Sequence, residues 1–149
     1  MKWIPRFALL FCFCLIGSEA KAQENYTEGP IWRVVLVKIK PGKTTDFWTD
    51  VRKNLKPTYE AYKREKVILD YAVYLKSTTE NEGDWDVGIA LQYPNYAALD
   101  GLAARTDPIT LQVYGSREAR AAAAAKRPEN GTLVASFLMR QVTPKDFPR

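Results

Sequence analysis

Histidine is absent from this chain of 149 residues, and its two cysteines, Cys12 and Cys14, both lie close to the N-terminus. The lack of histidine excludes imidazole haem ligation, imidazole metal sites and histidine acid–base catalysis. No cysteine follows Cys14, so a domain that starts beyond it has neither thiolate chemistry nor disulfides. We therefore expect no cofactor and no metal, and a fold held together by its hydrophobic core.

Long hydrophobic runs are also scarce, and the one unbroken run, Phe7 to Ile16, has only ten residues. Crossing a bilayer takes about 20 apolar residues, so no stable membrane anchor is expected. Lys2 and Arg6 precede the run, and the small-x-small motif Ala20-Lys21-Ala22 follows it. This three-part pattern predicts a cleaved secretory signal over residues 1–22 and a secreted or periplasmic product.

Some alternatives for this segment stay open, namely an uncleaved anchor, a buried strand, or cleavage after Ala20 instead of near Ala22. A lipoprotein signal is disfavoured because Phe11 and Phe13, not small residues, precede the two cysteines.

An excess of charge of one sign is missing as well. The chain has a formal net charge of +5, of which residues 1–22 carry +2, so the remainder is only mildly basic. Its basic and acidic residues are well mixed along the chain. No nucleic-acid partner is therefore expected, because such surfaces need clustered Lys and Arg.

Four alternating or apolar segments predict strands, at residues 31–40, 67–76, 85–93 and 132–142. A helix should follow Thr44 or Thr45, kink or break near Lys56 because of Pro57, and carry Asp50 on its exposed face. A second helical region should consist of residues 96–105 and a piece that Asp107 caps and that runs to about Lys126. The prediction is a single α+β domain of order β-α-β-β-α-α-β over residues 31–142, with an exposed arm at 23–30 and a tail at 143–149.

The first and last predicted strands are apolar on both faces, from Ile31 to Ile39 and from Leu133 to Met139. A sheet with one wet face alternates more cleanly, so both faces of this sheet need a cover. Helices supply one cover. A homodimer, or the arm or tail of a monomer, supplies the other.

The element order, together with the strand-end and helix-cap segment Tyr93-Pro94-Asn95-Tyr96, resembles the dimeric α/β-barrel superfamily of ferredoxin-like domains. The resemblance implies a four-stranded antiparallel sheet with helices on one face and a partner's sheet on the other. That superfamily includes cofactor-independent oxygenases, haem-degrading enzymes, peroxidases and small isomerases. The resemblance therefore does not select a function.

Two groups of residues are candidates for a site. Aromatic side chains on the predicted helix and strands line a pocket for a small apolar or aromatic ligand in one interpretation, and pack the core in the other. The ligand-binding candidates are Trp48, Tyr62, Tyr74 and Trp85. The catalytic candidates are Asp86, Arg140 and Tyr71.

Arg140 lies in a mostly apolar strand, on the face of Val134, Ser136, Leu138 and Val142. If it is buried, its charge needs a carboxylate such as Asp86 or Asp70, or an anionic ligand; otherwise it reaches solvent. The acidic residues Glu80, Glu82, Asp84 and Asp86 lack the calcium-loop pattern and are better explained as a solvated turn.

Three functions remain open from the sequence. The first is an exported homodimeric domain that binds a small molecule. The second is a cofactor-independent oxygenase or isomerase acting on a small aromatic substrate, and the third is a purely structural dimer.

Overall fold

The structure, a computed structural model, describes residues 25–78, 81 and 83–146. The predicted signal and the acidic residues Glu80 and Glu82 lie outside the described residues. The elements in chain order are β1 (Tyr26–Ile39), α1 (Thr44–Asp50), a π-helix (Val51–Leu55), α2 (Lys56–Arg64), β2 (Asp70–Leu75), β3 (Val87–Tyr93), a 3₁₀-helix (Tyr96–Leu99), α3 (Leu102–Tyr114), α4 (Arg117–Asn130) and β4 (Gly131–Pro144).

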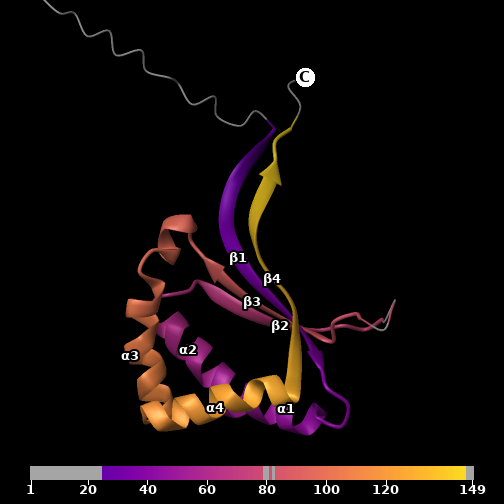
Figure 1. The fold of residues 1–149 in the computed structure, drawn as a ribbon. Coiled ribbons are helices and arrows are strands. Elements are labelled where there is room, and N and C mark those ends of the chain that lie inside the picture. The colour runs from indigo at the N-terminus through magenta and orange to yellow at the C-terminus, as the bar shows by residue number, and fades with distance from the viewer. Residues whose placement is uncertain (1–24, 79–80, 82, 147–149) are drawn as a thin grey trace, which may run out of the picture.

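The four strands form one sheet of order β2-β3-β1-β4, and every neighbouring pair is antiparallel. The helical segment α1–α2 connects β1 to β2, and α3–α4 connects β3 to β4, all gathered to one side of the strands (Figure 1). This topology is the ferredoxin-like arrangement, and it confirms the predicted α+β class and element order.

The core lies between the helices and one face of the sheet, in two clusters. One cluster contains Ile31, Val67, Ile68 and Tyr93. The other contains Phe47, Val51, Val87 and Ile89, with Val37 and Ile39 packed against it. The strand register places Ile31, Val35 and Val37 on this helix-covered face, paired with Tyr93, Ile89 and Val87.

The interruption predicted in the first helix is present as a widened turn. The π-helix at Val51–Leu55 joins α1 to α2, and Pro57 stands at the start of α2. Proline has no backbone N–H to donate to the preceding turn, so the wider turn removes a conflict that a continuous α-helix would carry.

The break predicted between Arg105 and Asp107 is wrong. Helix α3 continues through Pro108 to Tyr114, and the chain turns at Gly115, whose φ is 79°. Ser116 then caps α4, since its Oγ accepts a hydrogen bond of 3.0 Å from the N–H of Ala119. Asp107 does not cap a helix; instead its Oδ1 accepts a hydrogen bond of 3.2 Å from Arg120 of α4. Helix α4 also passes Pro128 and ends at Asn130, beyond the predicted stop.

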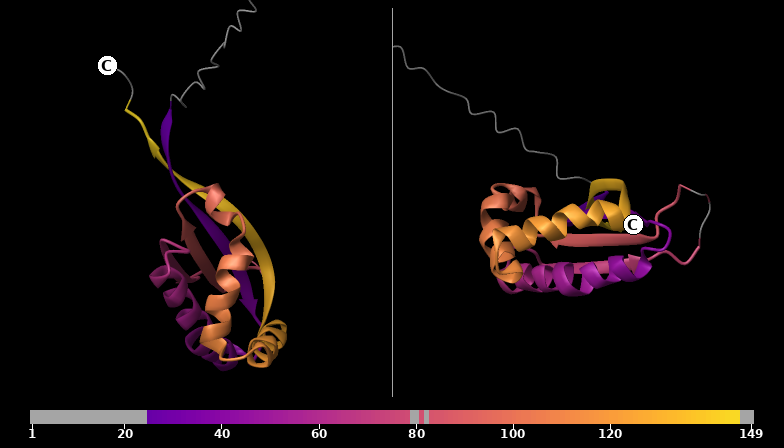
Figure 2. Two further views of the ribbon diagram at one scale, coloured as in Figure 1. Left: turned by 90° about the vertical axis from the view of Figure 1, so that its left-hand side faces the viewer. Right: turned by 60° about the horizontal axis from the view of Figure 1, so that its bottom comes forward.

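Strand extends into the predicted arm from Tyr26 onward and into the first two residues of the predicted tail, Thr143 and Pro144. Tyr26 pairs with Pro144 and Thr27 with Thr143, so β1 and β4 continue together past the rest of the sheet. Figures 1 and 2 show this two-stranded ribbon extending away from the helices. Backbone pairing between the two segments is the physical reason for the correction. The ribbon continues the line of the sheet, so its described residues do not cover the open face as a monomer would require.

A bulge in β4 changes which residues share a face. Leu36 pairs with Ala135 and Val37 with Leu133, which leaves Val134 as an extra residue in β4. Arg140, Leu138 and Ser136 therefore share the helix-covered side with Leu133, and Val134 drops out of the predicted set.

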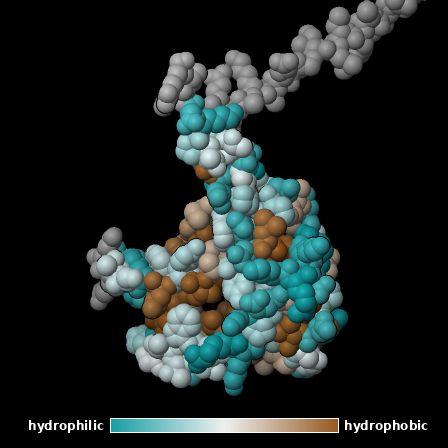
Figure 3. All heavy atoms as spheres, turned by 180° about the vertical axis from the view of Figure 1, so that it is seen from behind, coloured by the Kyte–Doolittle hydropathy of each residue, from teal (hydrophilic) through white to brown (hydrophobic). Residues whose placement is uncertain are grey.

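The opposite face of the sheet carries no helix among the described residues. On it lie Phe137 and Met139 of β4 and Tyr74 of β2, with exposed fractions of 41%, 46% and 54%. Hydrophobic side chains also reach the surface on the side seen from behind Figure 1 (Figure 3). In the single chain, the second cover predicted for the sheet is missing over the described residues.

Candidate functional site

A cavity of about 600 Å³ lies between the helix-covered face of the sheet and the helices α1, α2 and α4. Its apolar wall consists of Val35, Val37, Phe47, Leu55, Ile89 and Leu133. Its polar and charged lining includes Lys40, Asp50, Tyr59, Arg127 and Asn130. The arrangement is typical of a ligand pocket, in which apolar walls surround a few convergent polar groups.

The polar end of the cavity is an ion pair between two helices. Nε of Arg127 lies 3.1 Å from Oδ2 of Asp50, and the other carboxylate oxygen accepts a 2.6 Å hydrogen bond from the side-chain amide of Asn54. A terminal nitrogen of Arg127 donates to the hydroxyl of Tyr114. Only 15% of the Asp50 side chain is exposed, against 39% for Arg127. The expectation that Asp50 faces solvent is wrong, because α4 folds across α1 and brings Arg127 onto it.

Two tyrosines beside this ion pair hold their protons tightly. Burial raises the pKa of Tyr59 to about 12, although the charge of Arg127 opposes the shift. Burial likewise raises the pKa of Tyr114, with Arg127 acting in the opposite direction. Both phenols are therefore protonated at neutral pH and do not supply a phenolate base.

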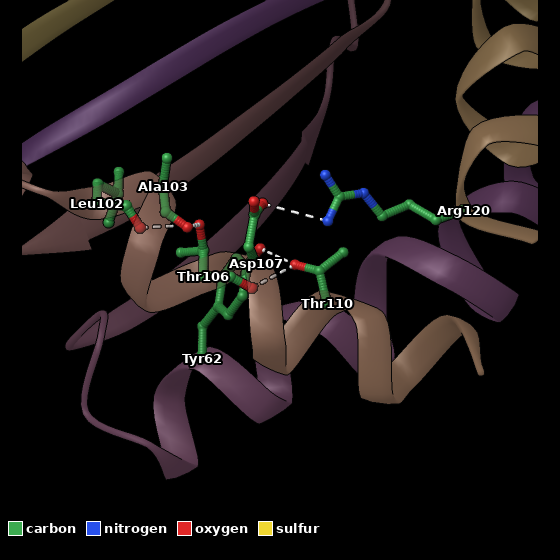
Figure 4. A network of polar contacts seen from close by, with 7 residues as sticks. All are labelled: Tyr62, Leu102, Ala103, Thr106, Asp107, Thr110 and Arg120. Atoms are coloured by element: carbon green, nitrogen blue, oxygen red, sulfur yellow. Dashed lines mark hydrogen bonds and ion pairs between the residues drawn. The ribbon is translucent and has the colours of Figure 1, made fainter. Parts of the chain in front are cut away.

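Tyr62 and Tyr71 do not line the cavity; they pack within the core and bond to neighbouring elements. The hydroxyl groups of Tyr62 and Thr110 are 2.5 Å apart, which ties α2 to α3 (Figure 4). The hydroxyl of Tyr71 donates to Oε1 of Glu60 at 2.6 Å, and its ring lies 5.4 Å from that of Tyr59. For these two residues the structure agrees with the core-packing interpretation.

Trp48 packs edge-on against Phe47, with ring centroids 5.6 Å apart, and is outside the cavity lining. Tyr74 and Trp85 belong to the open face of the sheet, where both approach Gly88. The ammonium of Lys76 lies 5.4 Å from the Trp85 ring centroid. The predicted aromatic pocket is thus not assembled, because Trp48 packs on the helical side of the sheet whereas Tyr74 and Trp85 lie on the open face.

Asp86 and Arg140 lie apart, and they contact opposite ends of β1. Oδ2 of Asp86 accepts a 2.7 Å hydrogen bond from the N–H of Ile39, and Oδ1 lies 3.8 Å from Nζ of Lys38. Arg140 instead forms an ion pair with Glu28, and its guanidinium lies 4.7 Å from the Tyr96 ring centroid.

Asp70 is likewise engaged elsewhere, with Lys63 at 2.8 Å. The predicted pairing of Arg140 with Asp86 or Asp70 is therefore wrong. Arg140 has a different partner because the ribbon of β1 and β4 brings Glu28 alongside it.

The polar end of the cavity was not predicted. Asp50 and Arg127 are separated by 77 positions, and each is unremarkable in its own helix, as one of several charges on an amphipathic surface. Tyr114 gives no signal either, since the helix that contains it was expected to pass through that position without interruption.

Over the part of the chain that the structure describes, no helix is both long and apolar enough to cross a membrane. Within the same residues, no group of three or more acidic, cysteine or histidine side chains is placed to hold a metal ion.

No known protein family matches this chain, and no curated protein shows significant sequence similarity to it. Similarity is found among solved structures. The crystal structure of HapK from Hahella chejuensis aligns with 80% of this chain and 98% of its own, with a TM-score of 0.48 and 10% identity.

A dimeric protein of unknown function and ferredoxin-like fold from Bacteroides fragilis NCTC 9343 aligns with 82% of this chain and all of its own. Its TM-score is 0.42 and its identity 17%. These are likenesses of fold alone.

Proposed function

We propose that this chain is an exported, homodimeric domain that binds a small molecule in the cavity between its sheet and helices. The observation that carries the proposal is the cavity itself, at about 600 Å³ with apolar walls and one polar end. Small-molecule pockets typically have about 300–1,000 Å³ of space. A purely structural dimer would instead have this region filled with side chains.

Binding is favoured over catalysis by the state of the polar groups. An oxygenase or isomerase without a cofactor needs a base to take a proton from its substrate. The carboxylate in the cavity lining, Asp50, already accepts hydrogen bonds on both of its oxygens, from Asn54 and Arg127, so a substrate proton would have to displace one of these donors. Tyr59, whose pKa is raised to about 12, stays protonated at neutral pH and so has no phenolate to take up a proton.

The open face of the sheet supports the homodimer. Its exposed side chains include Tyr74, Phe137 and Met139, whereas Val34 and Ala90 at the centre of the face are already buried. A second copy that applies the same face removes this apolar surface from both chains at once.

Export rests on the charged, apolar and small-residue pattern of residues 1–22. N-terminal sequencing of the protein recovered outside the cytoplasm is expected to begin at Gln23. A product that still begins at Met1 would contradict export by a cleaved signal.

The cavity is tested with phenylnaphthylamine, a neutral dye that fluoresces in apolar sites. The protein without residues 1–22 is expected to bind it saturably. Val35→Trp, which fills the cavity from the sheet side, should abolish that binding while circular dichroism and the melting temperature show a folded protein. Leu75→Trp adds the same side chain at an exposed position outside the cavity lining and should bind normally. Unchanged binding by Val35→Trp would refute the cavity as the site.

A direct comparison separates binding from turnover. Quinol- or anthrone-like compounds incubated with the protein and oxygen are expected to be recovered unchanged. Oxygen-dependent turnover that Val35→Trp abolishes would instead establish the oxygenase.

A further inference from the structure

We infer that the ligand of this cavity is an amphipathic anion, with an apolar body and a single anionic oxygen group that Arg127 and Lys40 bind. The inference rests on the proposed function, because it concerns the occupant of the same cavity.

The guanidinium of Arg127 has N–H donors that remain available to a ligand. Its Nε is engaged by Asp50 and one terminal nitrogen by Tyr114, whereas the other terminal nitrogen makes no hydrogen bond to any residue that the structure describes. The Arg127 side chain is 39% exposed and belongs to the cavity lining. A guanidinium with an open edge inside an apolar pocket favours an anionic oxygen, since hydrogen bonds between charged groups are stronger than those between neutral ones.

The charges of the lining do not balance. Arg127 and Lys40 are cationic, and Asp50 is the one carboxylate among the residues that line the cavity. Lys40 is exposed and forms no ion pair within the described part of the chain. The cavity therefore has a formal charge of +1 before a ligand enters, and one anionic group neutralises it.

A cationic ligand is disfavoured by the same arrangement. Asp50 is its natural partner, yet both oxygens of that carboxylate already accept hydrogen bonds, at 2.6 Å from Asn54 and 3.1 Å from Arg127. A cation would have to displace one of these donors and approach Arg127, at a cost in like-charge repulsion.

The apolar wall of the cavity indicates the chemistry of the part of the ligand that is not the anionic group. Val35, Val37, Phe47, Leu55, Ile89 and Leu133 offer no hydrogen-bonding side chains. A highly polar ligand such as a sugar phosphate would lose hydration along this wall without replacement. An apolar body with its acidic group at one end satisfies both regions.

The test uses two dyes that differ by one acidic group, anilinonaphthalene sulfonate and the neutral phenylnaphthylamine. The protein is expected to bind the sulfonate at least about tenfold more tightly, and the difference should shrink as salt is added. Arg127→Gln should weaken sulfonate binding about tenfold and Lys40→Gln about threefold, with the neutral dye affected much less by either change.

Lys126→Gln is the matched control, because Lys126 adjoins Arg127 in α4 but is outside the cavity lining. It removes the same charge and should leave both affinities unchanged. Lys40→Gln and Arg127→Lys keep the test valid if Arg127→Gln does not fold, since Lys40 is exposed and the lysine retains the charge.

The outcomes separate the two proposals. If the neutral dye binds in the cavity while the sulfonate binds no more tightly, or if Lys126→Gln matches Lys40→Gln and Arg127→Gln, the anion inference is overturned and cavity binding stands. If Val35→Trp affects neither dye, the proposed function fails, and the anion inference fails with it.

Discussion

At the scale of single residues, Asp86 shows how a carboxylate on a strand connection can be structural. It accepts the N–H of Ile39 at the end of β1 and lies beside Lys38, so it holds that strand end next to β3. This position is outside the cavity lining, which removes Asp86 from the catalytic candidates that the proposed site can use.

Asp86→Ala is therefore expected to lower the free energy of unfolding by about 1–3 kcal/mol, because it leaves the Ile39 N–H without its charged acceptor. Urea unfolding followed by circular dichroism measures the change. Asp107→Ala is the control, since its ion pair with Arg120 is exposed and should contribute no more than about 0.5 kcal/mol. Equal effects of the two changes would show that the Asp86 hydrogen bond is not important for stability.

Because Tyr59 is buried, we expect the folded protein to lose stability at alkaline pH. Its pKa is 10.0 in an ordinary environment and about 12 in the folded chain. Between these values the unfolded chain releases the phenolic proton and the folded chain keeps it, so rising pH favours unfolding. The stabilisation is complete below pH 10 and is lost as the pH rises toward 12.

Tyr59→Phe should flatten that decline and recover roughly 1–2 kcal/mol of unfolding free energy relative to wild type near pH 12. Urea unfolding from pH 9 to about 12 measures it. Tyr96→Phe, at a tyrosine that is 45% exposed, provides the comparison. Parallel pH profiles for wild type and Tyr59→Phe would contradict the buried-phenol explanation.

At the scale of elements, the α3–α4 junction positions the cationic end of the cavity. Gly115 adopts a positive φ that side chains disfavour, and Ser116 caps α4 at Ala119. From this start, α4 runs back toward α1 and delivers Arg127 to Asp50. The junction therefore couples a local capping interaction to the geometry of the proposed site.

Ser116→Ala should cost about 1 kcal/mol of unfolding free energy, as is usual for the loss of a helix N-cap. Thermal and urea unfolding both report it. Ser77→Ala, in the exposed segment after β2, should change stability by less than about 0.5 kcal/mol. A Ser116 variant as stable as the Ser77 variant would mean that the cap contributes little to α4.

At the scale of the whole molecule, the sheet has one face covered by helices and one face open. The open face joins apolar side chains from β1, β2, β3 and β4 in a single layer. Exposing such an apolar surface to water is energetically unfavourable, and the ribbon of β1 and β4 does not fold over it. This is the physical basis for the proposed homodimer.

Phe137→Asp places a charge in that face and is expected to convert a dimer into a monomer. Sedimentation equilibrium of the wild type and the variant measures the mass of each. Leu75→Asp changes a side chain that is 65% exposed on the other side of the sheet, and should remain a dimer. A monomeric wild type, or a Phe137→Asp variant that still dimerises, would refute association through this face.

Much of the architecture could be predicted from local patterns. The alternation of apolar residues located all four strands, and Pro57 located the interruption of the first helix. Boundaries were less predictable, because Pro108 and Pro128 both stand inside helices and backbone pairing extends β1 and β4 beyond their apolar centres. The candidate residues were less predictable still. Tyr62, Tyr71 and Asp86 turned out to bond neighbouring elements, and the cavity lining includes none of the seven candidates.

The sequence by itself determined the class of fold, the helix-covered core and the need for a second cover on the sheet, because these follow from periodicity along short segments. Tertiary structure alone decided the site. Arg127 meets Asp50 only when α4 crosses α1, and Glu28 meets Arg140 only when the chain ends pair as a ribbon. The physical reason is that the partner of a charged side chain depends on which residues are close to it in space. The sequence near Asp50 or Arg140 does not indicate which distant side chain the fold brings there.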